Sequence, residues 1–159
     1  MNKRSKDEVL PSLSDLLTKD TILLNKVVAD WREAIEKTGK ALVKTGAIEP
    51  RYIPAMMKFK EELGPYIVIA PGIALPHSRP KDGVLKPGFC LMTLKKPVEF
   101  GHQDNDPVDI VIAFAAVDNK QHIKALASLA NLLSDTGIVE KIRKAKNKKE
   151  ILSLISTKC

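Results

Sequence analysis

The spacing of apolar residues along the chain changes near Gly64. Before this point, apolar side chains recur every three or four positions, as they do along one face of an amphipathic helix. This spacing predicts helices over 12–18, 31–45 and 50–63, with a strand over 21–28 between the first two.

The predicted 31–45 helix carries signals for both of its ends. Asp30 can accept a hydrogen bond from the backbone at the start of the helix, and Glu33 stands at the position of a capping box. Gly46 can end the helix, because glycine readily adopts the left-handed conformation common at that place. The sequence therefore predicts a defined start and a defined end for this helix.

After Gly64 the apolar residues form short continuous runs instead. Such runs are typical of strands that are covered on both faces. Helical spacing returns after the last of these runs. The predicted strands are 66–70, 88–94 and 108–117, and the helices predicted to follow are 122–134, 137–145 and 147–157.

This order of elements predicts a single α/β domain. Helices, then strands, then helices favour a mixed parallel and antiparallel sheet of about five strands with helices on both faces. The chain has 159 residues, enough for one domain to bury a core without disulfides or metal clips. We expect the domain to span 12–157 and the polar residues 1–11 to form a loose tail.

The net charge of +7 is concentrated near the C-terminus. Residues 1–140 hold 19 basic and 18 acidic side chains, whereas six basic residues fall within 141–149. Such a run is typical of a solvated helix face or a junction between helices. Nucleic-acid binding is not expected, because no aromatic or base-reading residues accompany this run.

The cysteines and the hydropathy predict a cytoplasmic protein. Cys90 and Cys159 are the two cysteines, which gives no disulfide framework and suggests a reducing compartment. The first ten residues lack the apolar core of a signal peptide. The longest apolar run, 108–117, is interrupted by Asp109 and is too short to cross a membrane.

Three histidines are the candidates for chemistry, because no phosphate-binding glycine motif and no metal-binding cysteine or histidine pair occurs. His77 follows a strand and stands between Pro76 and Pro80 on a stiff stretch of backbone. His102 lies in a loop between two strands, and His122 lies in the first turn of a helix. Strand ends and helix starts meet at one edge of an α/β sheet, so the three histidines could converge there.

Three interpretations of these histidines stay open at this point. A zinc site needs at least three ligands, and the acidic loop 104–109 could add a carboxylate, although the spacing matches no metal motif. The histidines could instead be ordinary turn, loop and helix-start residues. In the third interpretation one histidine is a nucleophile, since neutral imidazole attacks phosphoryl groups near pH 7. Its phosphate would then need donors, such as a second histidine, the Ser78 hydroxyl, backbone N–H groups or an arginine.

Several separate motifs together resemble one protein family. In chain order they are IEPRY (48–52), GPYIVIAPGIALPHSRP (64–80), GVLKPGF (83–89), LKKPVEFGHQDNDPVDIVI (94–112) and AAVDNKQHIKALASLANLLSD (115–135). Their combination resembles the type-2 EIIA domain of the bacterial phosphoenolpyruvate-dependent sugar phosphotransferase system (PTS), over about residues 12–157. Within this mannitol/fructose-type family, the chain is most similar to the ascorbate-specific branch.

The resemblance implies a role for each histidine. The family's phosphorylated histidine stands in the motif read here as LPHSRP, which makes His77 the expected phosphoryl carrier. The family's second histidine starts the helix read here as QHIKALASL, so His122 is expected beside His77 as a donor to the phosphate. Ascorbate-type relatives also carry a histidine where His102 stands, which makes it a further candidate.

One position departs from the family's pattern. Mannitol-type relatives carry an arginine in the helix before the active-site strand, whereas this chain has Phe59 there, between Lys58 and Lys60. We therefore expect Arg79, two residues after His77, to supply the missing contact to the phosphate.

The resemblance also implies a reaction and its partners. A phosphoryl group passes from the histidine-containing phosphocarrier protein HPr to His77 and then to a cysteine of the cognate EIIB, while the membrane component EIIC takes up a sugar or ascorbate. Neither a metal nor an organic cofactor is implied. Ile73, Leu75 and the loop 101–107 are candidates for the docking face. An alternative is a regulatory EIIA-like module that binds other proteins according to its phosphorylation state, and two-fold self-association is left open.

Overall fold

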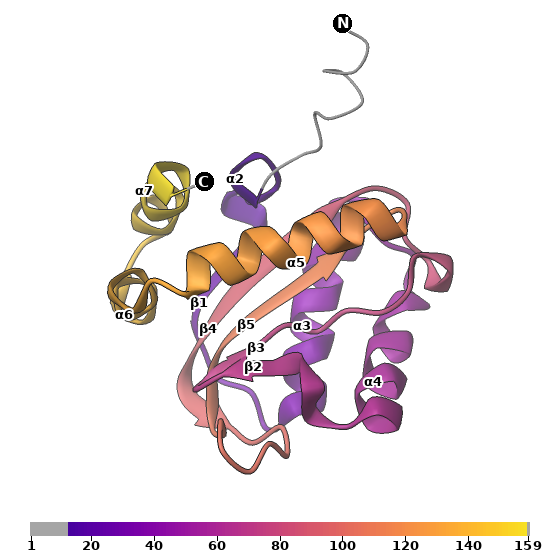
Figure 1. Ribbon diagram of the computed structural model, residues 1–159, viewed down its shortest axis with the longest axis horizontal. Coiled ribbons are helices and arrows are strands. Elements are labelled where there is room, and N and C mark those ends of the chain that lie inside the picture. The colour runs from indigo at the N-terminus through magenta and orange to yellow at the C-terminus, as the bar shows by residue number, and fades with distance from the viewer. Residues whose placement is uncertain (1–12, 159) are drawn as a thin grey trace, which may run out of the picture.

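A five-stranded mixed sheet forms the centre of the protein, with the strand order β1-β4-β5-β3-β2 (Figure 1). The computed structural model describes residues 13–158, and the expected loose tail over 1–11 lies outside these residues. The strands are β1 Ile22–Lys26, β2 Val68–Ala70, β3 Ile73–Ala74, β4 Gly88–Val98 and β5 Val108–Ala115. β1 is parallel to β4 and β3 is parallel to β5, whereas the β2–β3 and β4–β5 pairs are antiparallel. The predicted mixed sheet is thus confirmed.

Each α-helix of the described residues corresponds to a helix predicted from the spacing of apolar residues. They are α2 Leu13–Leu16, α3 Trp31–Lys44, α4 Tyr52–Leu63, α5 Asn119–Leu133, α6 Thr136–Lys144 and α7 Lys148–Lys158. Short 3-10 turns occur at η1 Lys19–Thr21, η2 Pro65–Ile67 and η3 Pro80–Asp82. The predicted strand over 66–70 therefore begins as a turn. Within residues 13–158, no helix is both long and apolar enough to span a membrane.

The Asp30 cap and the Gly46 end of α3 are as predicted, whereas Glu33 binds the residue before the cap instead of closing a capping box. The Asp30 carboxylate accepts a hydrogen bond from the backbone N–H of Glu33 at 2.9 Å, and the Glu33 carboxylate accepts one from the N–H of Ala29 at 2.6 Å. Gly46 follows the helix with a φ of 83°, in the region that favours glycine. The local sequence therefore sets both boundaries of α3.

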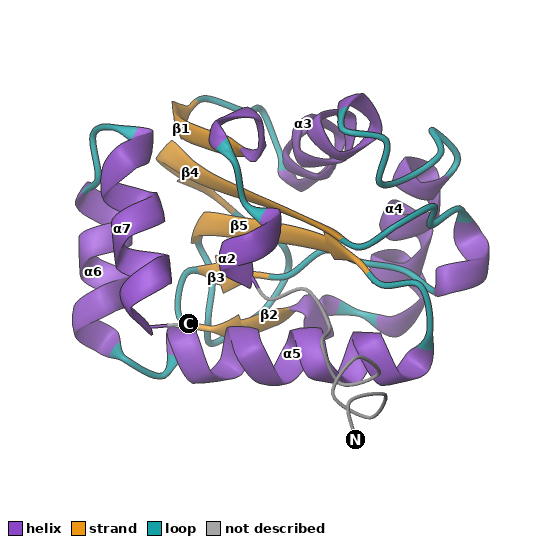
Figure 2. Ribbon diagram, turned by 90° about the horizontal axis from the view of Figure 1, so that it is seen from above, coloured by secondary structure: helices purple, strands orange, loops and turns teal. Residues whose placement is uncertain are grey.

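Both faces of the sheet are buried against helices (Figure 2). In β4, Cys90 and Met92 belong to the apolar cluster under α3 and α4. Their neighbours Phe89 and Leu91 belong to the cluster that includes residues of α2, α5, α6 and α7. Successive residues of a strand thus enter opposite cores, which explains why the strands read as continuous apolar runs.

The basic segment 141–149 includes a residue that joins α6 to the sheet. Nε of Arg143 lies 2.9 Å from Oδ2 of Asp109 on β5, and one Nη atom donates to the carbonyl oxygen of Pro71 at 2.9 Å. Part of the local charge excess therefore joins α6 to the sheet, which differs from the expected solvated face or junction between helices.

The close contact between α3 and α4 requires a residue without a side chain at Gly39. A Cβ atom there would lie 2.5 Å from Cγ1 of Ile53 on α4. We predict that Gly39→Val lowers the free energy of unfolding by about 2 kcal/mol, because overpacking forces the two helices apart. Urea unfolding followed by circular dichroism measures this loss. Lys40→Val is the matched control on the exposed side of α3, and an equal loss in both variants would show that packing is not the cause.

Candidate functional site

His77 lies where the segment after β3 passes the end of β5. The backbone N–H of Phe114 donates to the carbonyl oxygen of Pro76 at 3.1 Å, which continues the pairing of the two strands. The His77 ring stacks on the Phe114 ring, with centroids 4.7 Å apart and an interplanar angle of 22°. The imidazole therefore stands at the carboxyl edge of β3 and β5, where α/β proteins commonly place their sites.

A hydrogen bond fixes the position of the proton on the His77 ring. Nδ1 lies 2.7 Å from the carbonyl oxygen of Leu75. Because a carbonyl oxygen only accepts, the neutral ring carries its proton on Nδ1 and its lone pair on Nε2. Burial lowers the pKa of His77 to about 4, although the bond to Leu75 opposes the shift, and His122 lowers it further. The ring is neutral at pH 7, which is the form that acts as a nucleophile.

His122 stands beside His77, with the ring centroids 5.1 Å apart in an edge-to-face arrangement. It lies in the first turn of α5, which begins three residues earlier than predicted. Asp118 caps this helix by accepting a hydrogen bond from the N–H of Gln121 at 2.8 Å. Burial lowers the pKa of His122 as well. The structure thus brings together the two histidines that the sequence analysis paired.

Aromatic side chains complete the surroundings of His77. The Phe59 ring on α4 lies 5.4 Å from the His77 ring, and the Phe114 ring lies 5.4 Å from that of His122. Phe59 stands where mannitol-type relatives are expected to carry arginine, so α4 presents an apolar ring there. The imidazole therefore lies in a poorly solvated environment, which disfavours its charged form.

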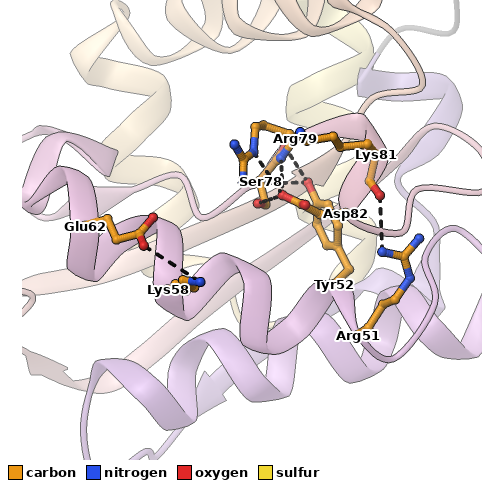
Figure 3. Close-up of polar contacts among 8 residues, drawn as sticks. All are labelled: Arg51, Tyr52, Lys58, Glu62, Ser78, Arg79, Lys81 and Asp82. Carbon is orange, nitrogen blue, oxygen red and sulfur yellow. Dashed lines mark hydrogen bonds and ion pairs between the residues drawn. The ribbon is translucent and has the colours of Figure 1, made fainter.

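Ser78 and Arg79 both bind Asp82 (Figure 3). The Ser78 hydroxyl donates to Oδ2 of Asp82, as do the backbone N–H and Nε of Arg79 at 3.2 and 3.3 Å. Burial would raise the pKa of Asp82, but these hydrogen bonds outweigh it and the pKa is lowered. Ser78 is 3% exposed, whereas the Arg79 side chain is 59% exposed. Of the two, Arg79 is the side chain that solvent and a partner can reach.

His102 lies at the opposite end of the sheet. It belongs to the loop that leads into the start of β5, whereas His77 contacts Phe114 near the end of that strand. At about 3.3 Å per residue, the six steps from Val108 to Phe114 span about 20 Å. Nδ1 of His102 instead accepts hydrogen bonds from two backbone N–H groups of its own loop. The prediction that His102 joins the site is therefore wrong, because the β4–β5 hairpin carries it to the other edge.

An apolar groove of about 550 Å³ opens beside His77. Its lining residues are Phe59, Leu63, Gly64, Tyr66, Ile67, Ile69, Leu75, His77 and Leu126. Leu63, Tyr66 and Ile69 are exposed large apolar side chains at this groove. Exposed apolar groups gathered around a cleft are typical of a surface that docks another protein.

The expected docking residues fit this face only in part. Leu75 lines the groove, although it is 2% exposed. Ile73 is equally buried and packs in the core beneath α5, and the loop 101–107 lies at the far edge with His102. Ile73 and the loop are thus excluded from the face around His77. Ile73 is buried two residues before Leu75 and does not line the groove, and the β4–β5 hairpin carries the loop to the far edge.

The sequence analysis did not single out Tyr52 and Phe114, which both contact the His77 segment. The Tyr52 hydroxyl accepts the backbone N–H of Ser78 at 2.8 Å. Aromatic residues make up 4% of the chain, and Tyr52 stands within the motif IEPRY. The small number of aromatic residues could have drawn attention to Tyr52 and Phe114, but the sequence does not show what an aromatic ring contacts.

The fold and the site together define a protein that carries a group on histidine. A neutral imidazole has a directed lone pair, a second histidine stands beside it, and an apolar groove adjoins both. Within residues 13–158, no group of three or more histidine, cysteine, aspartate or glutamate side chains is placed to hold a metal ion. The free lone pair on Nε2, set by the bond from Nδ1 to Leu75, suits this ring to nucleophilic attack.

Comparison with protein families identifies the carried group. Residues 15–158 match the family described as "Phosphoenolpyruvate-dependent sugar phosphotransferase system, EIIA 2". The chain belongs to this family. It is a PTS EIIA component, a phosphoryl carrier that works through a phosphohistidine intermediate.

Individual relatives agree with this assignment. The "Ascorbate-specific PTS system EIIA component" of Salmonella choleraesuis (strain SC-B67) is 44% identical over 141 residues, 88% of this chain and 92% of that protein. The mannitol-specific cryptic phosphotransferase enzyme IIA CmtB of Escherichia coli has a TM-score of 0.82 at 34% identity, covering 91% of this chain and 98% of that one. Escherichia coli enzyme IIA mannitol, solved in complex with phosphorylated enzyme IIB mannitol, has a TM-score of 0.79 at 34% identity, with coverages of 89% and 97%.

We predict that His77 titrates with a pKa of about 4 and keeps its proton on Nδ1 at neutral pH. Long-range ¹H–¹⁵N correlation spectra of the imidazole across the acidic range measure both properties, with His77→Gln to assign the signals. The unfolded chain binds a proton at this residue near pH 6.5 and the folded chain only near 4, so stability falls as the pH drops through this window. His77→Gln should show a weaker dependence there. Protonation of native His77 near pH 6.5 would contradict the neutral, partly buried ring.

Proposed function

We propose that Nε2 of His77 accepts a phosphoryl group from the phosphohistidine of HPr. The supporting observation is the 2.7 Å bond from Nδ1 to Leu75, which directs the lone pair to Nε2. A P–N bond forms to Nε2 while the P–N bond in HPr breaks, and the HPr ring retains the electron pair of that bond. Each ring keeps its own proton throughout, so transfer requires positioning and charge stabilisation and no separate base.

The second step passes the phosphoryl group to EIIB. A cysteine thiolate of EIIB attacks the phosphorus, so that a P–S bond forms and the P–Nε2 bond of His77 breaks, with the electron pair returning to Nε2. The complex of Escherichia coli enzyme IIA mannitol with phosphorylated enzyme IIB mannitol supports this partner. Both HPr and EIIB must approach the same nitrogen, so they dock in turn on the groove rimmed by Leu63, Tyr66 and Ile69.

The relatives support one substrate class. The chain is 44% identical over 145 residues to the "Ascorbate-specific PTS system EIIA component" of Escherichia coli (strain K12), 90% of this chain and 94% of that protein. We infer an ascorbate-type uptake system, in which this cytoplasmic protein loads EIIB and the membrane component EIIC takes up the substrate. This relationship supports a transport carrier over a regulatory module.

Two side chains, His122 and Arg79, are proposed to stabilise the negative charge of the phosphoryl group on His77. The phosphoryl group brings negative charge next to His122, which raises the pKa of that ring and favours its protonated, donating form. The Arg79 guanidinium is exposed two residues from His77 and can turn toward the phosphate while its backbone N–H stays bound to Asp82. Arg79 then replaces the arginine that α4 lacks at Phe59. The Ser78 hydroxyl, bound to Asp82, acts by holding the turn from which Arg79 extends.

We predict that the wild-type protein gains one acid-labile phosphoryl group on incubation with phosphoenolpyruvate, enzyme I and HPr, whereas His77→Gln gains none. Intact mass spectrometry measures the gain. His102→Gln is the matched control, because it removes a histidine at the far edge of the sheet and should be phosphorylated like the wild type. Absence of a phosphoryl group on the wild type would refute the proposed function, and its presence on His77→Gln would assign the carrier elsewhere.

We predict that Arg79→Ala and His122→Gln each slow transfer from phospho-HPr about tenfold, the effect of losing one charge-assisted hydrogen bond in the transition state. Rapid-quench kinetics with labelled phosphate measure these rates. Lys81→Ala is the matched control, because it removes an exposed cation from the same turn but keeps the backbone. A rate for Arg79→Ala equal to that of Lys81→Ala would exclude a role for Arg79 in phosphate binding.

A further inference from the structure

The hydroxyl of Tyr52 is hydrogen-bonded to the backbone of Ser78, the residue after His77 (Figure 3). Tyr52 is the first residue of α4 and is 0% exposed. Its oxygen accepts the N–H of Ser78 at 2.8 Å and lies 3.0 Å from the carbonyl oxygen of Phe114 and 3.1 Å from that of Ser78. A hydroxyl has one proton, so it donates to one of these carbonyls at a time. Tyr52 thereby joins α4 to the His77 segment and to the end of β5.

Tyr52 is hydrogen-bonded to both residues that hold the His77 imidazole in place, Ser78 and Phe114. Ser78 follows His77 directly in the chain, and Phe114 carries the ring on which His77 stacks. On the sheet side, the N–H of Phe114 holds the carbonyl oxygen of Pro76 at 3.1 Å. The segment 76–78 is therefore held by the β5 backbone on one side and by the Tyr52 hydroxyl on the other.

We infer that Tyr52 is a positioning residue for phosphoryl transfer, whose hydroxyl holds segment 76–78 against β5 and so keeps Nε2 of His77 on the line of attack. The inference rests on the proposed function of His77. Pro76 and Pro80 stiffen the segment, but stiffness alone does not set where the segment lies on the sheet. Burial raises the pKa of Tyr52, so its hydroxyl keeps its proton and both donates and accepts at neutral pH.

Tyr52→Phe removes the hydroxyl and keeps the ring that fills the core. The buried N–H of Ser78 then loses its partner, and the segment can shift to find another. A displacement of about 1 Å at a reacting atom costs on the order of 100-fold in rate. We expect kcat for transfer from phospho-HPr to fall about 10- to 100-fold, with KM changed less than about twofold, because Tyr52 is not part of the docking groove.

Thr38→Val is the matched control. Thr38 also carries a fully buried hydroxyl, on the helix α3 that packs against α4, but it donates to the carbonyl oxygen of Ala34 within α3. Its loss should lower the melting temperature by a similar amount and leave kcat unchanged. A fall in kcat common to both variants would mean that lost stability, and not lost positioning, explains the effect, and would overturn the inference.

A spectroscopic readout separates this inference from the proposed function. In Tyr52→Phe the Nδ1–H signal of His77 should exchange faster with water, and its ring ¹⁵N shifts should move toward a mixture of tautomers, with neither change in Thr38→Val. This measurement requires no HPr, so it tests positioning even if the wild type is not phosphorylated. Unchanged His77 signals together with unchanged kcat would overturn the inference.

If Tyr52→Phe does not fold, hydrogen exchange of the wild-type protein tests the inference instead. The Ser78 amide should exchange on the order of 100-fold or more slowly than an unprotected amide, because its partner is a buried hydroxyl. Exchange at the unprotected rate would show that the Tyr52 bond does not hold the segment in solution, and would overturn the inference without any variant.

Discussion

The site depends on one hydrogen bond, from Nδ1 of His77 to the carbonyl oxygen of Leu75. This bond selects the tautomer, and the tautomer decides which nitrogen can attack. The carbonyl can hold the ring only because Leu75 is itself fixed, with its N–H donating to the carbonyl oxygen of Ile67 at 2.8 Å. The short strands β2, at the edge of the sheet, and β3, between β2 and β5, are flanked by the residues that make this contact, so they help to position the reactive nitrogen.

The apolar cores on the two faces of the sheet meet at the His77 segment. The Phe114 ring belongs to the core on the α5 side, whereas Tyr52 belongs to the core on the α3–α4 side. The His77 segment lies between them at the end of β5, stacked on the first and hydrogen-bonded to the second. The groove beside it runs from α4 to α5 for the same reason, since its lining residues come from both layers. A site built at this junction is rigid on its inner side and open on its outer side.

The sequence predicted the elements well because their signals are local. The Asp30 cap, the apolar face of α3 and the continuous runs of β4 and β5 each follow from neighbouring residues. The His77–His122 pair was predictable because a strand end and a helix start share one edge of an α/β sheet. The same reasoning gave the wrong position for His102, because the loop between antiparallel β4 and β5 lies at the start of β5 and not at its end. The role of Tyr52 was not predictable, since it depends on a contact across 26 positions of the chain.

No uncompensated charged side chain lies against the His77 ring among the described contacts. Phe59 and Phe114 flank His77, and the charge of Asp82 is already compensated by Ser78 and Arg79. A cation fixed beside the ring would be costly to bury while no phosphate is bound. On the proposed function, His122 avoids this cost. Burial lowers its pKa while no phosphate is bound, and a phosphoryl group on His77, whose ring centroid lies 5.1 Å from that of His122, would favour the protonated form. On the proposed function, apolar Phe59 in place of arginine is consistent with a site whose positive charge appears together with the phosphate.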